Sequence, residues 1–256
     1  MASSPTDLPV HRFTGYGGAA LAYREMGEGR PVVLIHGFFS NATTNWVRYG
    51  HAAKIAAAGY RVIMPDLRGH GDSMTSHDPA DYPRDVLTDD GFALIAHLGL
   101  TDYDLGGYSL GGRTTMRMLA CGATPGRAIV SGMGLEGIVD TAGRGGHFRH
   151  ILTNLGTFER GSPAWMAEAF LKTTGGDPQA LLLVLDTFVD TPRAALDDIA
   201  MPVLVLTGDT DDGNGSAAAL ADALPHGRYR AVPGNHMSAV ARPELGMAIA
   251  EFLVAR

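Results

Sequence analysis

The chain has 256 residues, a formal net charge of −7 and 45% hydrophobic residues, which suits one large α/β domain with an insertion and buries an ample core. It contains no run of lysine and arginine that would attract a phosphate backbone, so we expect no nucleic-acid partner. The single cysteine, Cys121, excludes an intrachain disulfide and a multi-cysteine zinc site. We interpret it as a buried structural thiol in a reducing compartment.

Two further features of the sequence argue against a secreted protein and against a membrane-spanning one. Residues 1–8 are small and polar, without the basic start and the apolar run of a signal peptide. No stretch reaches the roughly 20 apolar residues that a membrane-spanning helix needs. We expect a cytoplasmic protein without a membrane partner, a monomer or a small homo-oligomer, that acts on a small-molecule substrate.

Short apolar runs alternate with segments of helical period, a pattern that indicates βαβ units and a mostly parallel sheet. The expected strands are residues 20–26, as an antiparallel edge, and then 31–35, 60–64, 103–107, 127–131, 203–207 and 228–232. The expected helices cover residues 46–58, 85–98, 110–121, 216–223 and 243–254. Gly59, Gly99 and Gly122 stand where three of these helices should end. The fold class is therefore α/β.

The alternation of strands and helices stops between residues 133 and 197. Three short helical patterns take its place, at residues 147–158, 163–173 and 178–188. We predict a core made of residues 1–132 and 198–256, with 133–197 as a helical cap over the carboxyl ends of the strands, where ligands bind in open α/β sheets. A stabilising appendage is the alternative.

The most informative motif is Gly107-Tyr-Ser-Leu-Gly111, a serine with a glycine two positions away on each side. A nucleophile at the top of a sheet needs a strained turn, and the neighbouring strand and helix then come too close to tolerate a Cβ at either glycine. An apolar strand ends before Ser109 and a helical pattern follows it, as a nucleophile elbow requires. Ser109 is therefore the candidate nucleophile.

A serine hydroxyl needs a base within hydrogen-bond reach, and the chain offers ten histidines. His236 follows the last apolar strand and precedes the last helix, which places it at the same edge of the sheet as Ser109. We interpret His36 and His70 as residues that shape turns, His147 and His150 as at most substrate contacts in the cap, and the others as surface residues.

The acid that orients the base is expected in Thr-Gly-Asp-Thr-Asp-Asp-Gly, the loop after the next-to-last strand. We assign Asp211 to this role, because Asp209 suits a turn cap and Asp212 suits a solvent-facing position. Glu136 and Asp140 are more distant alternatives. The loop lacks the full calcium-binding pattern, so we expect no metal.

An oxyanion hole needs two convergent N–H donors. The amide of Leu110 stands at a helix N-terminus, whose dipole also favours negative charge. We expect the second donor to be the amide of Phe38, because Gly37 before it lets the backbone approach the reacting carbonyl.

Five segments taken together resemble the α/β-hydrolase superfamily in order and spacing, over nearly the whole chain. They are His36-Gly-Phe-Phe, Asp66-Leu-Arg-Gly-His-Gly-Asp-Ser, Gly107-Tyr-Ser-Leu-Gly-Gly, Gly208-Asp-Thr-Asp and Gly234-Asn-His. The resemblance implies a mostly parallel eight-stranded sheet flanked by helices with a small helical cap. It also implies Ser109 as nucleophile, Asp211 as acid, His236 as base, and the amides of Phe38 and Leu110 as the oxyanion hole.

Serine at position 109 argues against the aspartate-nucleophile dehalogenases and epoxide hydrolases of that superfamily. The chain is similar to its cofactor-independent serine esterases, enol-lactone hydrolases, carbon–carbon bond hydrolases and perhydrolases. We predict hydrolysis of a small or medium carboxylic ester or lactone without a cofactor. The alternatives are cleavage of ring-fission diketones, perhydrolysis, and a non-catalytic ligand-binding relative. The candidate substrate contacts are Phe39, Tyr108, Phe148, Trp165, Phe170 and Met237.

Overall fold

The computed structural model describes residues 8–255, and for residues 142–144 it describes the backbone alone. Eight strands form one sheet in the order β1-β2-β4-β3-β5-β6-β7-β8, which confirms the expected eight-stranded α/β fold. The strands are β1 (His11–Thr14), β2 (Ala20–Met26), β3 (Arg30–Ile35), β4 (Tyr60–Asp66), β5 (Asp104–Tyr108), β6 (Ala128–Ser131), β7 (Val203–Gly208) and β8 (Gly227–Val232). The pairs β4-β3, β3-β5, β5-β6, β6-β7 and β7-β8 are parallel, whereas β2 pairs antiparallel with both β1 and β4.

Strand β1 lies outside β2, so the expectation that residues 20–26 form the edge of the sheet is wrong. Only Phe13 of the four residues of β1 is buried. One buried side chain gives no apolar run and no alternation long enough to indicate a strand.

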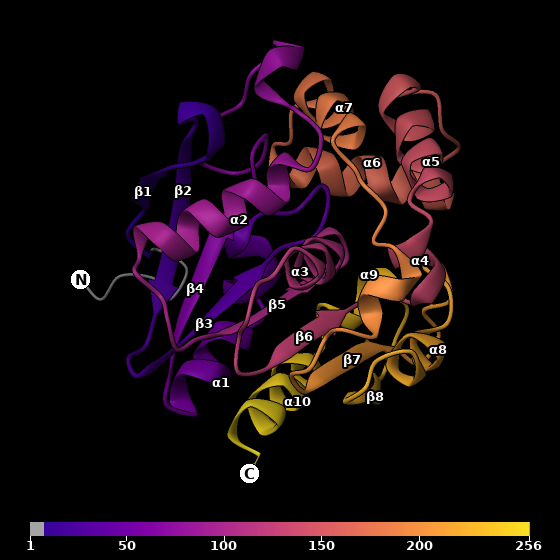
Figure 1. Ribbon diagram of the computed structural model, residues 1–256. Coiled ribbons are helices and arrows are strands. Elements are labelled where there is room, and N and C mark those ends of the chain that lie inside the picture. Colours follow the sequence, from indigo (N-terminus) through magenta and orange to yellow (C-terminus); the bar gives the residue numbers. More distant parts are fainter. Residues whose placement is uncertain (1–7, 256) are drawn as a thin grey trace, which may run out of the picture.

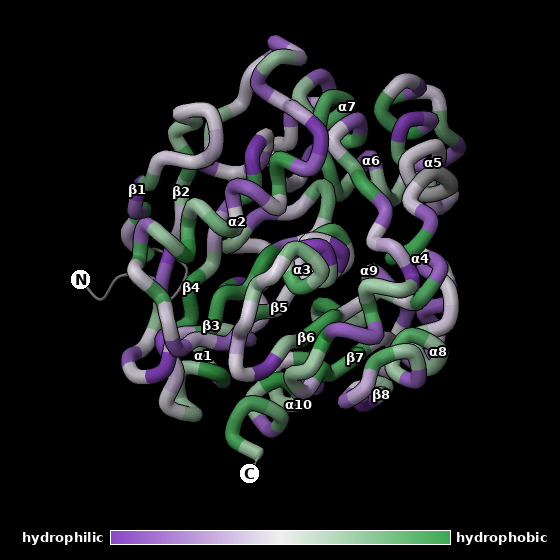
Figure 2. Tube along the Cα trace, in the orientation of Figure 1, coloured by the Kyte–Doolittle hydropathy of each residue, from purple (hydrophilic) through white to green (hydrophobic). Residues whose placement is uncertain are grey.

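The strands separate two hydrophobic cores, one on each face of the sheet. In β3, Val33 and Ile35 belong to the larger core, whereas Val32 and Leu34 belong to the smaller one, because successive side chains of a strand point to opposite faces. Hydrophobic residues run through the central strands in Figure 2. Burial on both faces explains why these strands read as continuous apolar runs.

Helices cover both faces of the sheet (Figure 1). They are α1 (His51–Ala57), α2 (Val86–His97), α3 (Leu110–Ala120), α8 (Ala217–Asp222), α9 (His236–Ala239) and α10 (Pro243–Val254), with short turns η1 (Tyr16–Gly18), η2 (Thr43–Val47), η3 (Pro79–Asp81) and η4 (Arg193–Leu196). Helices α1 and α10 pack together on the face of the smaller core, and α2 packs on α3 on the other face.

The expected single helix over residues 46–58 is wrong, because the segment is broken. A π-type turn, η2, ends at Val47, and α1 begins only at His51. Between them Gly50 has a φ of 75°, a left-handed conformation that glycine adopts at low cost and that interrupts a helix.

Four helices follow one another between β6 and β7: α4 (Leu135–Val139), α5 (Ala142–Thr153), α6 (Pro163–Thr174) and α7 (Pro178–Asp186). The last three lie close together in Figure 1. Ser162 and Asp177 cap α6 and α7 with side-chain oxygens, and a proline follows each cap, the favoured start of a helix. Thr174 donates a hydrogen bond of 2.6 Å to the carbonyl oxygen of Phe39, which ties α6 to the loop after β3.

Two expectations about single residues are wrong. Cys121 is exposed just beyond the end of α3, rather than buried. His51 is fully buried, rather than a surface residue, and its Nε2 lies 2.6 Å from the carbonyl oxygen of Val240. In residues 8–255, no helix has the length and apolar character to cross a bilayer.

Candidate active site

Ser109 lies in a sharp turn between β5 and α3. Its φ of 55° and ψ of −114° lie in a region that only a strained turn imposes on a non-glycine residue. A Cβ at Gly107 would overlap the backbone of Gly111, and a Cβ at Gly111 would overlap the carbonyl group of Ile35. The expected close approach of strand and helix is thus confirmed. The turn places Ser109 at the carboxyl edge of the sheet.

His236 approaches Ser109 from the first position of α9, after β8. Asn235 fixes this start, because its side chain accepts hydrogen bonds from the amides of Met237 and Ser238. The Nε2 atom of His236 lies 2.9 Å from Ser109 Oγ, and Nδ1 lies 2.8 Å from Asp211 Oδ2. The structure therefore joins the three predicted residues in one chain of hydrogen bonds.

The other carboxylates that were considered have different surroundings. Asp209 accepts a hydrogen bond of 2.9 Å from the amide of Gly234, as expected of a turn cap, and Asp212 is exposed. Glu136 accepts one of 2.8 Å from the amide of Ser216. The Asp211 side chain is only 2% exposed, so water screens its interaction with the His236 ring weakly.

Asn214 is a neighbour of His236 that the sequence did not indicate. Its Nδ2 donates to the carbonyl oxygen of Gly132 over 2.8 Å and lies 3.4 Å from His236 Nδ1. Asn214 is buried, and its contacts with Gly132 and His236 help to fix the loop between Asp211 and α8. A single asparagine in a loop of small polar residues carries no pattern that would reveal this role.

His36 and His70 are buried side by side, with ring centroids 5.0 Å apart. His36 accepts a hydrogen bond of 3.0 Å from the amide of Leu67, and its Nδ1 lies 2.8 Å from the carbonyl oxygen of Gly37. Burial lowers the pKa of His36 to about 4 and that of His70 to about 3. Both rings are neutral near pH 7, and the expectation that they shape turns is confirmed.

The turn after β3 brings Phe38 next to Ser109. The amide of Gly37 donates a hydrogen bond of 3.0 Å to Asn45 Oδ1, and the amide of Ser40 donates to the carbonyl oxygen of Gly37 over 3.1 Å. These bonds fix the backbone on both sides of Phe38. Phe38, Ser109 and Leu110 line one small space, as two oxyanion donors would have to.

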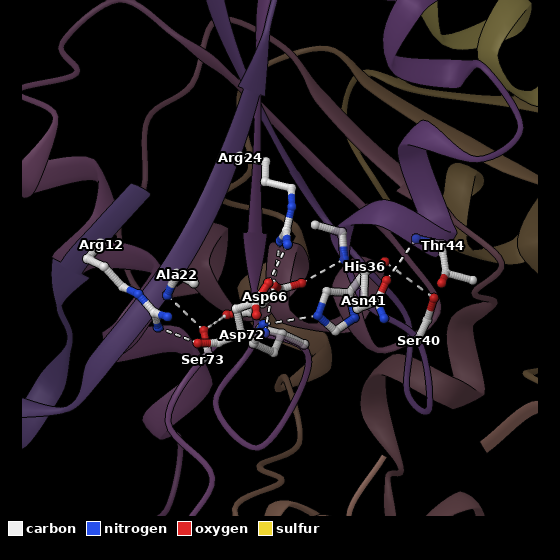
Figure 3. A network of polar contacts seen from close by, with 12 residues as sticks. Arg12, Ala22, Arg24, His36, Ser40, Asn41, Thr44, Asp66, Asp72 and Ser73 are labelled. Carbon is white, nitrogen blue, oxygen red and sulfur yellow. Dashed lines mark hydrogen bonds and ion pairs between the residues drawn. The ribbon is translucent and has the colours of Figure 1, made fainter. Parts of the chain in front are cut away.

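Asp66, at the end of β4, contacts the same turn and lies at the centre of a network of polar contacts (Figure 3). Its Oδ1 accepts a hydrogen bond of 2.8 Å from the amide of Ala42, and its Oδ2 accepts one of 2.9 Å from Arg24 and one of 3.0 Å from the amide of Asp72. The carboxylate is fully buried, so each of these bonds forms out of contact with water. Asp66 thus connects the loop after β3 to the strands β2 and β4.

We expect Asp66→Asn to lower the free energy of unfolding by about 2 kcal/mol. Both oxygens of Asp66 accept hydrogen bonds from N–H groups, so the NH₂ group of an asparagine would face an N–H donor in either orientation of its side chain. Urea denaturation measures the change. Asp102→Asn is the matched control, since Asp102 also pairs with an arginine, Arg30, but is 79% exposed, and we expect a change within about 0.5 kcal/mol. Equal effects of the two substitutions would contradict the structural role of Asp66.

A cavity of about 130 Å³ opens beside Ser109 and His236. Five of the six predicted substrate contacts line it: Phe39, Tyr108, Phe148, Phe170 and Met237. Trp165, on the same helix as Phe170, is not among the described residues that line the cavity. Sequence reasoning missed Ser40, Thr44, Asn45, Tyr49, Ala167 and Val240, which also line it. Tyr49 comes from the broken segment, residues 46–58, for which the sequence indicated one helix, and Asn45 directly precedes that segment.

A model of the alpha/beta hydrolase family matches residues 32–248, most of the chain. The chain belongs to the alpha/beta hydrolase family. Two solved structures share this alpha/beta hydrolase fold. A thermophilic esterase from Thermogutta terrifontis has a TM-score of 0.75 at 23% identity, over 96% of this chain and 98% of that one. The enol-lactonase from Burkholderia xenovorans LB400 has a TM-score of 0.72 at 21% identity, over 96% of this chain and 100% of that one.

Curated relatives of this alpha/beta hydrolase match over shorter stretches. The non-heme chloroperoxidase CPO-A1 of Kitasatospora aureofaciens is 39% identical over 95 residues, which is 37% of this chain and 33% of the relative. The chain matches 33 to 39% of the length of this and two further relatives. These partial matches agree with membership of the alpha/beta hydrolase family.

Proposed function

We propose that this alpha/beta hydrolase cleaves small or medium carboxylic esters or lactones through an acyl-enzyme on Ser109. The observation that carries the proposal is the chain of hydrogen bonds from Ser109 Oγ through His236 to Asp211, with distances of 2.9 and 2.8 Å, beside an apolar cavity that Ser109 and His236 line. This is the arrangement that turns a weakly nucleophilic hydroxyl into an attacking group.

In the first half of the reaction, Ser109 Oγ bonds to the ester carbonyl carbon while its proton passes to His236 Nε2. The carbonyl oxygen becomes an oxyanion, for which the amides of Phe38 and Leu110 are the proposed donors. The bond from carbon to the alcohol oxygen then breaks, and His236 returns the proton to that oxygen. Asp211 keeps the proton-accepting nitrogen of the ring directed at Ser109 and stabilises the imidazolium that forms.

In the second half, water attacks the acyl carbon and gives its proton to His236. The bond from carbon to Ser109 Oγ breaks, the proton returns to Ser109, and the carboxylic acid leaves. With a lactone, acid and alcohol remain parts of one product. No residue changes its oxidation state, and all protons are accounted for by His236 and water.

The test is covalent labelling of the folded protein with a fluorophosphonate probe, alongside turnover of p-nitrophenyl acetate. We expect one label per chain, on Ser109, and no label on Ser109→Ala. Ser131→Ala is the matched control, since it removes a buried hydroxyl from the neighbouring strand β6, and it should keep the label.

Equal rates of ester hydrolysis for the wild type and Ser109→Ala would remove Ser109 from the mechanism. An unlabelled, folded wild-type protein would favour a non-catalytic relative. Turnover of ring-fission diketones with negligible ester turnover would favour carbon–carbon cleavage by the same three residues.

A further inference from the structure

The turn after β3 contains a strained residue directly after Phe38, the proposed oxyanion donor. The amide of Ser40 donates a hydrogen bond of 3.1 Å to the carbonyl oxygen of Gly37, which closes a four-residue β-turn over residues 37–40. Phe39, the third residue of this turn, has a φ of 60°. Turns with a positive φ at the third position usually have glycine or asparagine there. A phenylalanine keeps this conformation only where its surroundings hold it.

A hydroxyl group at the end of helix α6 holds the backbone of this residue. Thr174, the last residue of α6, donates a hydrogen bond of 2.6 Å to the carbonyl oxygen of Phe39. Its Oγ1 also lies 3.0 Å from the carbonyl oxygen of Leu171 and 3.3 Å from that of Phe170, the usual acceptors for a threonine in a helix. One hydroxyl has one hydrogen to donate, and the Leu171 carbonyl already accepts from the amide of Gly175. The shortest contact, with Phe39, is therefore the hydrogen bond.

This hydrogen bond is connected to the amide of Phe38 through two peptide groups. Thr174 binds the carbonyl of Phe39, which shares a peptide group with the amide of Ser40. The Ser40 amide binds the carbonyl of Gly37, which shares a peptide group with the amide of Phe38. A peptide group is planar, and its N–H points away from its C=O. Holding the two carbonyls therefore fixes the direction of the Phe38 N–H, and hydrogen bonds in such a chain also polarise one another.

We propose that Thr174 is a positioning residue for the oxyanion hole, because its hydroxyl holds the turn over residues 37–40 in the conformation that directs the Phe38 amide to the oxyanion. This inference rests on the proposed function, in which that amide is one of the two donors. Helix α6 also lines the cavity, through Ala167 and Phe170. The segment between β6 and β7 would thus contribute to catalysis, beyond acting as a stabilising appendage.

Thr174→Val tests the proposal, because it removes the hydroxyl and keeps the shape of the side chain. Thr173→Val is the matched control, since Thr173 is exposed and donates over 2.8 Å to the carbonyl oxygen of Ala169 in the same helix. The measurements are kcat and KM for p-nitrophenyl acetate, per active site counted with the fluorophosphonate probe, and the inhibition constant Ki of trifluoroacetophenone. Ser109 Oγ bonds to the carbonyl carbon of this ketone, the serine proton passes to His236, and the ketone oxygen becomes an oxyanion. Its Ki therefore reports on the oxyanion hole.

We expect Thr174→Val to lower kcat about 10-fold, to raise the Ki of trifluoroacetophenone by about the same factor, and to leave KM within about twofold. Loss of a whole donor costs about 10²–10³-fold, whereas here the Phe38 N–H is present but less well directed. Both halves of the reaction form an oxyanion, so kcat falls whichever half limits the rate. Thr173→Val should change kcat and Ki by no more than about twofold. Thr174→Ser, which restores the hydroxyl, should return kcat to within about threefold of the wild type.

A kcat and a Ki of Thr174→Val within about twofold of those of Thr173→Val would overturn the positioning role and leave the proposed function intact. A raised KM with unchanged kcat and Ki would overturn it too, since Thr174 would then only shape the cavity. If the valine variant does not fold, Thr174→Ala provides the same test with a residue of higher helix propensity, and Ki does not depend on the fraction of folded protein. A wild type that neither hydrolyses p-nitrophenyl acetate nor reacts with the fluorophosphonate would instead overturn the proposed function, and the role of Thr174 with it.

Discussion

Replacing His236 by alanine is expected to lower kcat for ester hydrolysis by a factor on the order of 10⁶, and Ser109→Ala is expected to have the same effect. The reason is that Ser109 Oγ and His236 Nε2, 2.9 Å apart, act as one unit. Without the base, the hydroxyl keeps its proton, and without the hydroxyl, the base has no proton to take. The double variant should therefore be no slower than either single variant.

Asp211→Asn completes this test with a smaller expected loss, on the order of 10⁴-fold in kcat. An asparagine amide at 2.8 Å from Nδ1 would donate to the ring rather than accept from it, and would turn the proton-bearing nitrogen toward Ser109. Steady-state and single-turnover hydrolysis of p-nitrophenyl acetate measure all four variants. His226→Ala, which removes an exposed imidazole, is the control. Losses that multiply in the double variant would show that Ser109 and His236 act independently, contrary to the proposal.

The sequence was sufficient to predict the central strands and the order of the site, for a physical reason. Strands β3 and β5 to β7 are buried on both faces, so their apolar runs are long enough to recognise. In parallel strands the carboxyl ends lie at one edge. Residues in the loops after these strands, such as Ser109 and Asp211, consequently come together whatever the details of the connecting helices.

The sequence was not sufficient where tertiary contacts decide the outcome. The break before α1 depends on Gly50 in a left-handed conformation, and a glycine among apolar residues does not specify that by itself. His51 is buried because α10 packs over it, with Gly246 leaving room for its ring. The Asn45 side chain accepts a hydrogen bond from the amide of Gly37, eight residues earlier, and Asp66 binds the amide of Ala42 in the loop between them. None of these relations has a period or a motif that pattern analysis can detect.

Gly111→Ala is expected to lower the free energy of unfolding by about 3 kcal/mol and to remove most of the ester hydrolysis of the protein that still folds. A Cβ at this position would overlap the carbonyl group of Ile35 and lie 2.8 Å from the carbonyl oxygen of His36. Both obstacles are backbone atoms at the end of β3, so the strand or α3 must shift. The shift would move Leu110 and Phe38, the two proposed oxyanion donors, away from Ser109, and loss of one donor alone costs about 2.7–4 kcal/mol in the barrier.

Gly146→Ala separates this steric effect from the ordinary effect of alanine in a helix. Gly146 lies in α5, is exposed, and has open space where a Cβ would be. Because alanine has the higher helix propensity, Gly146→Ala should leave the stability unchanged or raise it by up to about 1 kcal/mol. Urea denaturation and kcat/KM for p-nitrophenyl acetate compare the two variants. If Gly111→Ala were as stable and as active as Gly146→Ala, the close crossing of α3 and β3 could not be what holds the Ser109 turn in its strained conformation.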